Sequence, residues 1–464
     1  MIITILQFFL SLSILVVLHE LGHFVTAKWF KTKVEKFYLF FNPGFALFKK
    51  QIGETEYGIG WLPLGGYVKI AGMIDESFDT EQMSKEPQPW EFRSKPAWQR
   101  LIIMVGGVFV NAVLGVFLFT MILLTWGTEY ILNDELPEGI AVSETAYKLG
   151  LRDGDKILKV GDFTLERFSS GTVTKELVIN GANTITIERA GTQQTLTVQP
   201  ELVQELTKHE NRNVQVVAVR RPYIFSSLTE DGGAKKAGLL EGDKIMAVNG
   251  APTPYAHQYI KEMAQFHVPK ESFVRKLIGG LFGKKKPEKV IPATVDIKVS
   301  RDNRELDFTV PMNNGKIGVY PQALDKVLPV HIQEYNLSQA MVGAWDKSVN
   351  FIGDQVKAFG QMFSGKIKAK DSLGSFITIG GMFGTNWDWQ RFWSMTATLS
   401  LLLGFLNLLP IPALDGGYVM FLIFESITGI KVPDRVMEIA TFFGFLLLMI
   451  LMIYAFGLDI SRTI

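Results

Sequence analysis

The sequence predicts a polytopic α-helical membrane protein with four transmembrane helices and a large polar region in the middle of the chain. Four runs contain no Asp, Glu, Lys or Arg, and they cover residues 1–19, 101–128, 392–414 and 439–458. Each run approaches or exceeds the roughly 20 apolar residues that a spanning helix needs. Nothing comparable occurs between residues 129 and 391. We therefore expect two spans, a polar region and then two more spans.

The first run is better explained by a retained span than by the alternative, a cleaved signal peptide. It lacks a basic N-terminal region, and no small-residue cleavage site follows it. Its apolar character resumes at residues 24–30.

The orientation in the membrane follows from basic residues near the span ends. Lys and Arg gather between the first two spans and in the short loop before the fourth, for example Lys31, Arg100 and Lys431. By the positive-inside rule, these segments are cytoplasmic, and both termini and the polar region are extracytoplasmic.

Composition excludes several classes of protein and site. The formal net charge is +1 over 464 residues, which gives no support to nucleic-acid binding. The chain contains no cysteine, so disulfides and cysteine metal sites are excluded.

The polar region contains an internal repeat. Residues 148–162 read KLGLRDGDKILKVGD, and residues 236–250 read KAGLLEGDKIMAVNG. The pattern resembles PDZ domains, so we expect two tandem α+β PDZ-like domains at 129–219 and 220–328. Such domains bind extended peptides by strand addition; a repeat that only spaces or shields is the alternative. A basic, partly apolar insert at 273–289 either touches anionic lipid or forms a solvated loop.

A further helix is expected after the repeats, within residues 329–390. Apolar residues recur there at spacings of three and four, which is one stripe on a helix. The stripe comprises Val342, Trp345, Val349, Ile352, Val356, Phe359 and Phe363. We expect it to pack on the PDZ-like pair or to lie at the membrane surface.

The first span ends in a metal-binding pattern. His19-Glu20-Leu21-Gly22-His23 is HExxH, and residues i and i+4 of a helix share one face. Both imidazoles can therefore bind one ion, with Glu20 placed to take a proton from a metal-bound water. Ionisable groups inside a span are costly and mark function. A satisfied packing histidine, the bland alternative, does not account for three such groups in five residues.

A catalytic zinc site needs a third protein ligand. The other histidines, at positions 209, 257, 267 and 331, all fall in the outer region. Asp415 follows the third uncharged run directly, at the same end of the membrane as HExxH. Pro410 and Pro412 cannot both lie in a regular helix, so a broken helix lining a site is expected, with Asn407 also inside it. The alternative places Asp415 at the interface, capping a turn.

HExxH in the first span and the pattern Asn407-x-x-Pro410-x-Pro412-x-Leu414-Asp415-Gly416 in the third together resemble the site-2 protease family of intramembrane zinc metalloproteases. Four spans with two outer PDZ-like domains resemble one bacterial branch of that family. The resemblance implies a bacterial inner-membrane protease with one zinc ion per chain. Its substrates would be single-span membrane proteins of the anti-sigma-factor type, or remnant signal peptides, cut after a first extracytoplasmic cleavage.

The resemblance also implies roles for individual residues. His19, His23 and Asp415 would bind zinc, and Glu20 would be the general base. The substrate-binding candidates are Asn407, Pro410, Pro412 and, in a membrane-associated β-loop at residues 65–73, Tyr67, Val68 and Lys69. A related pattern in the second span differs in proline and spacing, which leaves the role of Asn111 open.

The rival hypothesis is a non-catalytic membrane scaffold that presents PDZ-like domains, although a scaffold needs neither HExxH nor Asp415. The expected segments are a span with HExxH at 1–30, a cytoplasmic-side segment with the β-loop at 31–98, a span at 99–128, the two outer domains, an amphipathic segment at 329–390, a span at 391–425 and a span at 435–459.

Overall fold

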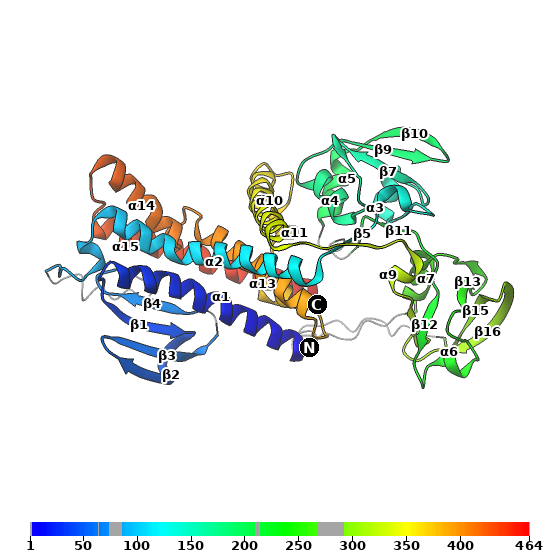
Figure 1. Ribbon diagram of the computed structural model, residues 1–464, viewed down its shortest axis with the longest axis horizontal. Coiled ribbons are helices and arrows are strands. Elements are labelled where there is room, and N and C mark those ends of the chain that lie inside the picture. The colour runs from blue at the N-terminus through cyan, green and yellow to red at the C-terminus, as the bar shows by residue number, and fades with distance from the viewer. Residues whose placement is uncertain are drawn as a thin grey trace. The chain divides into compact units, whose positions relative to one another are not determined.

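The computed structural model describes residues 2–63, 65–73, 86–208, 211, 214–266 and 292–463 (Figure 1). They form two compact units. The helical unit comprises Met1–Gly127, Glu334–Val356 and Leu373–Ser461, and the sheet unit comprises Thr128–Gln333, Lys357–Ser372 and Arg462–Ile464.

The helical unit is built around long apolar helices. Among the described residues, three helices are long and apolar enough to cross a membrane: α1 (Ile2–Trp29), α2 (Ala97–Trp126) and the Asp434–Arg462 part of α15 (Asp434–Thr463). Helix α2 packs against α1, α13 (Trp389–Asn407) and α14 (Asp415–Thr428). Helix α2 is therefore the common packing partner of α1, α13 and α14.

The third expected span is divided between two helices. Helix α13 ends at Asn407 and α14 begins at Asp415, with no helix between them. Pro410 and Pro412 lie in this break, where each lacks the backbone N–H that a helix interior requires. Ala413 there has a φ of 83°, in the left-handed region. The break brings Asp415 to the first turn of a new helix.

A four-stranded sheet follows α1 within the same unit. Its strands are β1 (Val34–Leu39), β2 (Phe41–Ile52), β3 (Thr55–Leu62) and β4 (Tyr67–Ile70), in the order β2-β3-β1-β4. Strand β1 runs parallel to β3 and antiparallel to β4. The stretch expected as a β-loop thus contains an edge strand, β4, that packs against α1.

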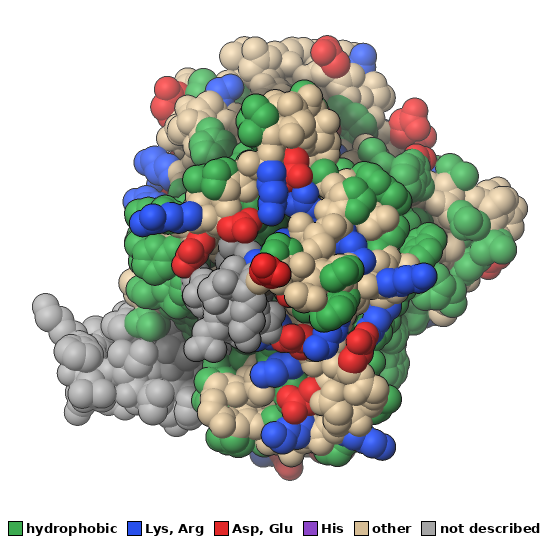
Figure 2. All heavy atoms as spheres, turned by 90° about the vertical axis from the view of Figure 1, so that its left-hand side faces the viewer, with side chains coloured by type: hydrophobic (Ala, Val, Ile, Leu, Met, Phe, Trp, Pro, Cys, Tyr) green, Lys and Arg blue, Asp and Glu red, His purple; other side chains and the backbone are tan. Residues whose placement is uncertain are grey.

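Basic and acidic side chains are mixed on one face of the molecule. The face shown in Figure 2 carries Lys and Arg side chains mixed with Asp and Glu. Lys28 pairs with Glu54, and Lys431 pairs with Asp434 at 3.5 Å. The mixture of signs gives the face no single strong charge.

The sheet unit contains two modules whose elements follow the same order, except that the first has an additional helix, α5, before its last strand. The first has β6 (Ile140–Val142), α3 (Glu144–Lys148), β7 (Lys156–Val160), β8 (Phe163–Thr164), α4 (Ser170–Val178), β9 (Thr184–Arg189), β10 (Thr192–Thr197), α5 (Pro200–Thr207) and β11 (Val217–Val219). The second has β12 (Phe225–Leu228), α6 (Gly233–Lys236), β13 (Lys244–Val248), β14 (Ala251–Pro252), α7 (Ala256–Ala264), β15 (Thr294–Arg301), β16 (Arg304–Pro311) and β17 (Val319–Pro321). Their four-stranded sheets correspond, as β10-β9-β7-β8 and β16-β15-β13-β14.

Shorter elements complete the sheet unit. Strand β5 (Thr128–Tyr130) pairs with β18 (His331–Gln333). Helices α9 (Leu324–Val327) and α11 (Ala369–Ser372) lie outside the two modules.

The repeated Gly-Asp-Lys sequence has one structural role in both modules. Asp155 accepts two hydrogen bonds from Arg189, and Asp243 accepts two from Arg301, with both carboxylates buried. The paired residues are 34 apart in the first module and 58 apart in the second. The longer separation contains residues 267–291, so the expected basic insert at 273–289 lies outside the described residues.

Helix α10 (Leu337–Phe363) packs within the helical unit through small residues and Ile352 of the stripe. Within the helical unit, its small residues Ala340 and Ala344 are buried in a cluster with Leu118 and Leu123 of α2. Val342 and Trp345 of the stripe are exposed. Small side chains allow two helix backbones to approach closely, so these residues explain how α10 lies against α2.

Candidate metal centre

Two imidazoles and one carboxylate converge inside the helical unit. The Nε2 atoms of His19 and His23 lie 3.2 Å apart. Oδ2 of Asp415 lies 3.3 Å from Nε2 of His19 and 3.4 Å from Nε2 of His23. A tetrahedral ion with bonds of about 2.0–2.1 Å separates its ligand atoms by roughly 3.3 Å. The triangle therefore has the size of one face of a zinc coordination tetrahedron.

The residues also fit zinc in chemistry and environment. Two nitrogens and one carboxylate oxygen form a donor set typical of catalytic zinc, with a fourth position left for water or substrate. Both histidines are buried, and Oδ2 of Asp415 is buried without a hydrogen-bond donor. A buried carboxylate oxygen without a donor is unfavourable unless a cation compensates it. Among the described residues, this is the one group of three such side chains close enough to hold an ion.

Local sequence explains how each ligand is placed. His19 and His23 are one helical turn apart on α1, so they share a face. Asp415 is the first residue of α14, directly after the proline-containing break. A Cβ on Gly416 would lie 2.2 Å from the Leu409 carbonyl oxygen, so only glycine lets α14 fold back this closely on the break.

Helix α2 passes directly against the two histidines. A Cβ on Gly107 would lie 2.4 Å from His23 Nε2 and 2.7 Å from His19 Cε1. A Cβ on Gly22 of α1 would lie 2.3 Å from the Gly106 carbonyl oxygen. Glycine is therefore required on both helices for the crossing that encloses the centre.

Glu20 faces both the metal ligands and the edge strand. Its carboxylate accepts a hydrogen bond from the backbone N–H of Val68 in β4, and the charges of His19, His23 and Asp415 act on it. A carboxylate beside an open metal position can accept a proton from an attacking water.

The candidate substrate-binding residues differ in how close they lie to the triangle of His19, His23 and Asp415. The side-chain amide of Asn407, at the end of α13, lies 3.2 Å from His19 Nε2, next to the ligand triangle. Pro410 and Pro412 lie in the break that precedes Asp415. Val68 reaches the centre through its backbone. The side chain of Lys69 instead lies 3.7 Å from Glu35 in an ion pair.

The Tyr67 side chain stabilises the sheet rather than facing the centre. Its ring stacks on Tyr38 with centroids 5.3 Å apart and on Phe41 at 6.0 Å. Its hydroxyl donates to Oδ1 of Asn42. Burial and a hydrogen bond to Glu56 raise the pKa of the Tyr38 hydroxyl, so this partner ring stays neutral. The stack holds β4 against β1 and so fixes the strand that contacts Glu20.

The sequence reasoning singled out Asn111 but left its role open, and the structure places its side chain 3.1 Å from His19 Nδ1. Two other contacts were not predicted. His23 Nδ1 lies 2.8 Å from the Ile103 carbonyl oxygen, and a largely buried ion pair joins Arg100 at the start of α2 to Glu425 of α14. For the ion pair, the available signal was the position of the two charged residues beside apolar runs.

Two of the other histidines, His257 and His331, lie in the sheet unit. His257 pairs with Asp153 at 2.9 Å and His331 with Glu135 at 2.6 Å, all in the sheet unit. The histidines at positions 209 and 267 lie outside the described residues.

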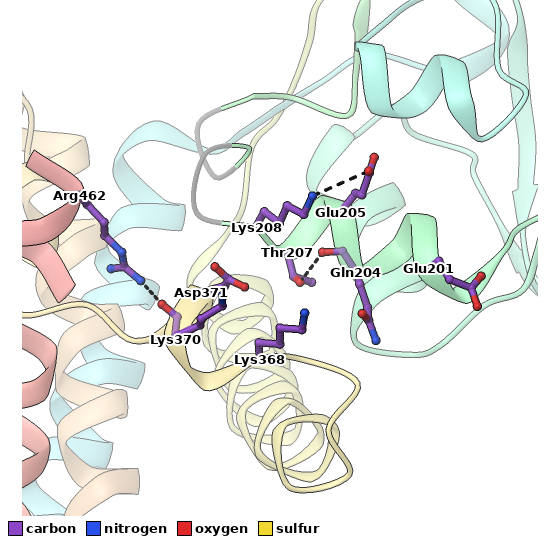
Figure 3. Close-up of a pocket in the computed structure, with 9 residues that line it drawn as sticks. All are labelled: Glu201, Gln204, Glu205, Thr207, Lys208, Lys368, Lys370, Asp371 and Arg462. Carbon is purple, nitrogen blue, oxygen red and sulfur yellow. Dashed lines mark hydrogen bonds and ion pairs between the residues drawn. The ribbon is translucent and has the colours of Figure 1, made fainter. Parts of the chain in front are cut away.

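A polar hollow in the sheet unit has no comparable chemistry. It measures about 670 Å³, and its lining residues are Glu201, Gln204, Glu205, Thr207, Lys208, Lys368, Lys370, Asp371 and Arg462 (Figure 3). Arg462 donates a hydrogen bond to the Lys370 carbonyl. Four basic and three acidic side chains line it, so their formal charges nearly balance.

Comparison with known proteins places the chain in a family. The sequence pattern of Peptidase family M50 matches residues 7–451. The chain is similar to the regulator of sigma-E protease RseP of Escherichia coli K12, with 28% identity over 483 residues and 98% of each chain covered. A regulator of sigma E protease of Haemophilus influenzae is 27% identical over 476 residues, also covering 98% of each. A candidate zinc metalloprotease of Neisseria meningitidis is 29% identical over 483 residues, covering 99% of each. The resemblance inferred from the motifs is thus confirmed: the chain belongs to Peptidase family M50 and is a zinc metalloprotease.

Proposed function

We propose that this metalloprotease is an intramembrane endopeptidase that cuts single-span membrane proteins within or near the bilayer. One observation carries the proposal: His19, His23 and Asp415 form a zinc-sized triangle, and both histidines lie on α1, a helix long and apolar enough to cross a membrane. Helices α13 and α14 with their break count as one span, which gives four spans. One zinc ion per chain would occupy the triangle.

The chain's own groups divide the chemistry between them. A zinc ion held by the three ligands would polarise the scissile carbonyl and activate a water. Glu20 accepts the proton of that water and passes it to the leaving amine, which restores the carboxylate. The Asn407 amide, beside His19 Nε2, donates a hydrogen bond to the substrate backbone.

Strand β4 is the proposed docking edge for substrate. A helical substrate must unwind before hydrolysis, because its carbonyls are hydrogen-bonded within the helix. Strand β4 is the last strand of its sheet and adjoins Glu20 through Val68. An extended segment added along this edge would therefore lie beside the metal centre. We assign this role to the backbone of Tyr67, Val68 and Lys69, and we assign to Pro410 and Pro412 the role of keeping the opposite wall non-helical.

The sheet unit fits an extracytoplasmic filter. Its two modules are proposed to be PDZ-like domains in the bacterial periplasm, with both chain termini on the same side and the centre near the cytoplasmic face. They would exclude membrane proteins whose outer domains have not been removed by a first cut. Relatives named as regulators of sigma-E protease favour an anti-sigma-factor type of substrate and a role in stress response. Remnant signal peptides are a second substrate class. A scaffold without catalysis would not need the convergence of Glu20 with three metal ligands.

Glu20→Gln is the direct test of this mechanism. The variant should retain zinc, because Glu20 is not a ligand, and should lose cleavage of a single-span substrate in liposomes. Asp415→Ala is the matched variant and should lose the zinc itself. Cleavage by Glu20→Gln at the parent rate would refute the assignment. Zinc retained by Asp415→Ala would refute the ligand set.

A further inference from the structure

The two histidines of the centre differ in how their second ring nitrogens are held. His23 Nδ1 lies 2.8 Å from the Ile103 carbonyl oxygen of α2. A carbonyl only accepts, so Nδ1 of His23 carries the hydrogen, and the lone pair of Nε2 is free to face a metal. His19 requires the same tautomer to bind through Nε2, and its Nδ1–H therefore needs an acceptor of its own.

Asn111 is the group placed to supply that acceptor. Its side chain is fully buried, and its Nδ2 atom lies 3.1 Å from His19 Nδ1. An amide nitrogen donating to Nδ1 would leave the hydrogen of His19 on Nε2, where it blocks metal binding. The two ends of a carboxamide have nearly the same size, so a half turn of the amide puts Oδ1 against Nδ1–H. Oδ1 of Asn111 has no partner in its present orientation.

The surroundings fix Asn111 at this position. The backbone carbonyl of Asn111 accepts a hydrogen bond of 2.7 Å from the Ser400 hydroxyl, which ties α2 to α13. Gly107, one turn earlier on α2, leaves the space that the imidazoles occupy. Ile103 and Asn111 thus hold the two histidines from one helix, roughly two turns apart.

We infer that Asn111 is a positioning residue of the metal centre: its Oδ1 accepts the Nδ1–H of His19 and turns Nε2 of His19 toward Asp415. The inference rests on the proposed function of the three ligands. Loss of such an outer hydrogen bond typically lowers metal affinity by about 10–100-fold. Asn111 needs no contact with substrate for this effect.

The test measures zinc affinity of the purified full chain in detergent by competition with a chelator. Asn111→Leu removes the acceptor and should lower the affinity by about 10–100-fold. Asn111→Asp keeps an oxygen at the same place and should bind zinc at least as tightly as the parent. Ser400→Ala, which loses only the bond to the Asn111 backbone, controls for helix packing and should stay within a few fold.

Each outcome decides a different point. Parent-like affinity in a folded Asn111→Leu protein would overturn the inference, as would an equal loss in Asn111→Leu and Asn111→Asp. If the leucine variant does not fold, the aspartate variant decides alone, and a tenfold loss in it refutes the inference. Asp415→Ala is measured in parallel. If it too leaves zinc binding unchanged, the proposed metal centre fails, not merely the role of Asn111.

Discussion

Gly107→Ala is the substitution for which the structure gives the sharpest expectation. The added Cβ would lie 2.4 Å from His23 Nε2 and 2.7 Å from His19 Cε1. Non-bonded heavy atoms need about 3.5 Å, so α2 or the imidazoles must move by roughly 1 Å. Metal–ligand distances tolerate only about 0.2 Å. A misplacement of about 1 Å can lower a catalytic rate by on the order of a hundredfold.

The assay compares zinc content and substrate cleavage in Gly107→Ala with those in Gly115→Ala. A Cβ on Gly115 would meet Leu401 Cδ2 at 2.5 Å, which is as crowded, but the neighbour is a flexible side chain far from the ligands. We expect Gly107→Ala to lose zinc and at least a hundredfold in activity, and Gly115→Ala to keep both nearly intact. Parent-like zinc content and cleavage in Gly107→Ala would show that α2 does not enclose the centre as described.

Three further predictions concern the metal, the Arg100–Glu425 pair and the second module of the sheet unit. Removal of metal by a chelator should abolish cleavage, and added Zn²⁺ should restore it; activity that survives complete metal loss would contradict the proposed chemistry. Glu425→Gln leaves the buried Arg100 without its carboxylate partner, so we expect the protein to lose about 3–5 kcal/mol in stability. The loss is measured as a lower unfolding temperature. An unchanged unfolding temperature would mean that the pair contributes nothing to stability. Asp243→Asn should destabilise the second module, because its charged bonds to Arg301 are lost. We expect faster proteolysis within residues 220–328 and a zinc content equal to that of the parent. Protease resistance equal to that of the parent would count against this role of Asp243.

The sequence allowed the two histidines to be placed together, and the helix break before Asp415 to be predicted, because both follow from local sequence. HExxH places His19 and His23 on one helical face whatever the rest of the fold does. Pro410 and Pro412 predicted the break before Asp415, and the break is present. Both are short-range effects of backbone geometry, which a sequence records directly.

Contacts between helices distant in the sequence could not be predicted in the same way. The pair Arg100–Glu425 joins residues 325 positions apart, and no periodicity reports which helices are neighbours. The apolar stripe on α10 was predicted to pack on the PDZ-like pair or to lie at the membrane surface, and that prediction stays open. The buried residues of α10 are the small Ala340, Ala344 and Ser348, because close approach between helices depends on small side chains.

Helix α2 contributes no metal ligand, yet it sets the geometry of the centre. The proposed metal ligands lie on α1 and α14, and Asn407 lies on α13; all three helices pack on α2. Along α2, Arg100 anchors α14, Ile103 and Asn111 orient the two histidines, and Gly107 admits them. A zinc site assembled from separate helices needs such a common reference, because each ligand must stay within tenths of an ångström of its position while substrate enters. Helix α2, which the sequence shows only as an uncharged span, therefore holds the HExxH helix and α14 in the positions that the proposed metal centre requires.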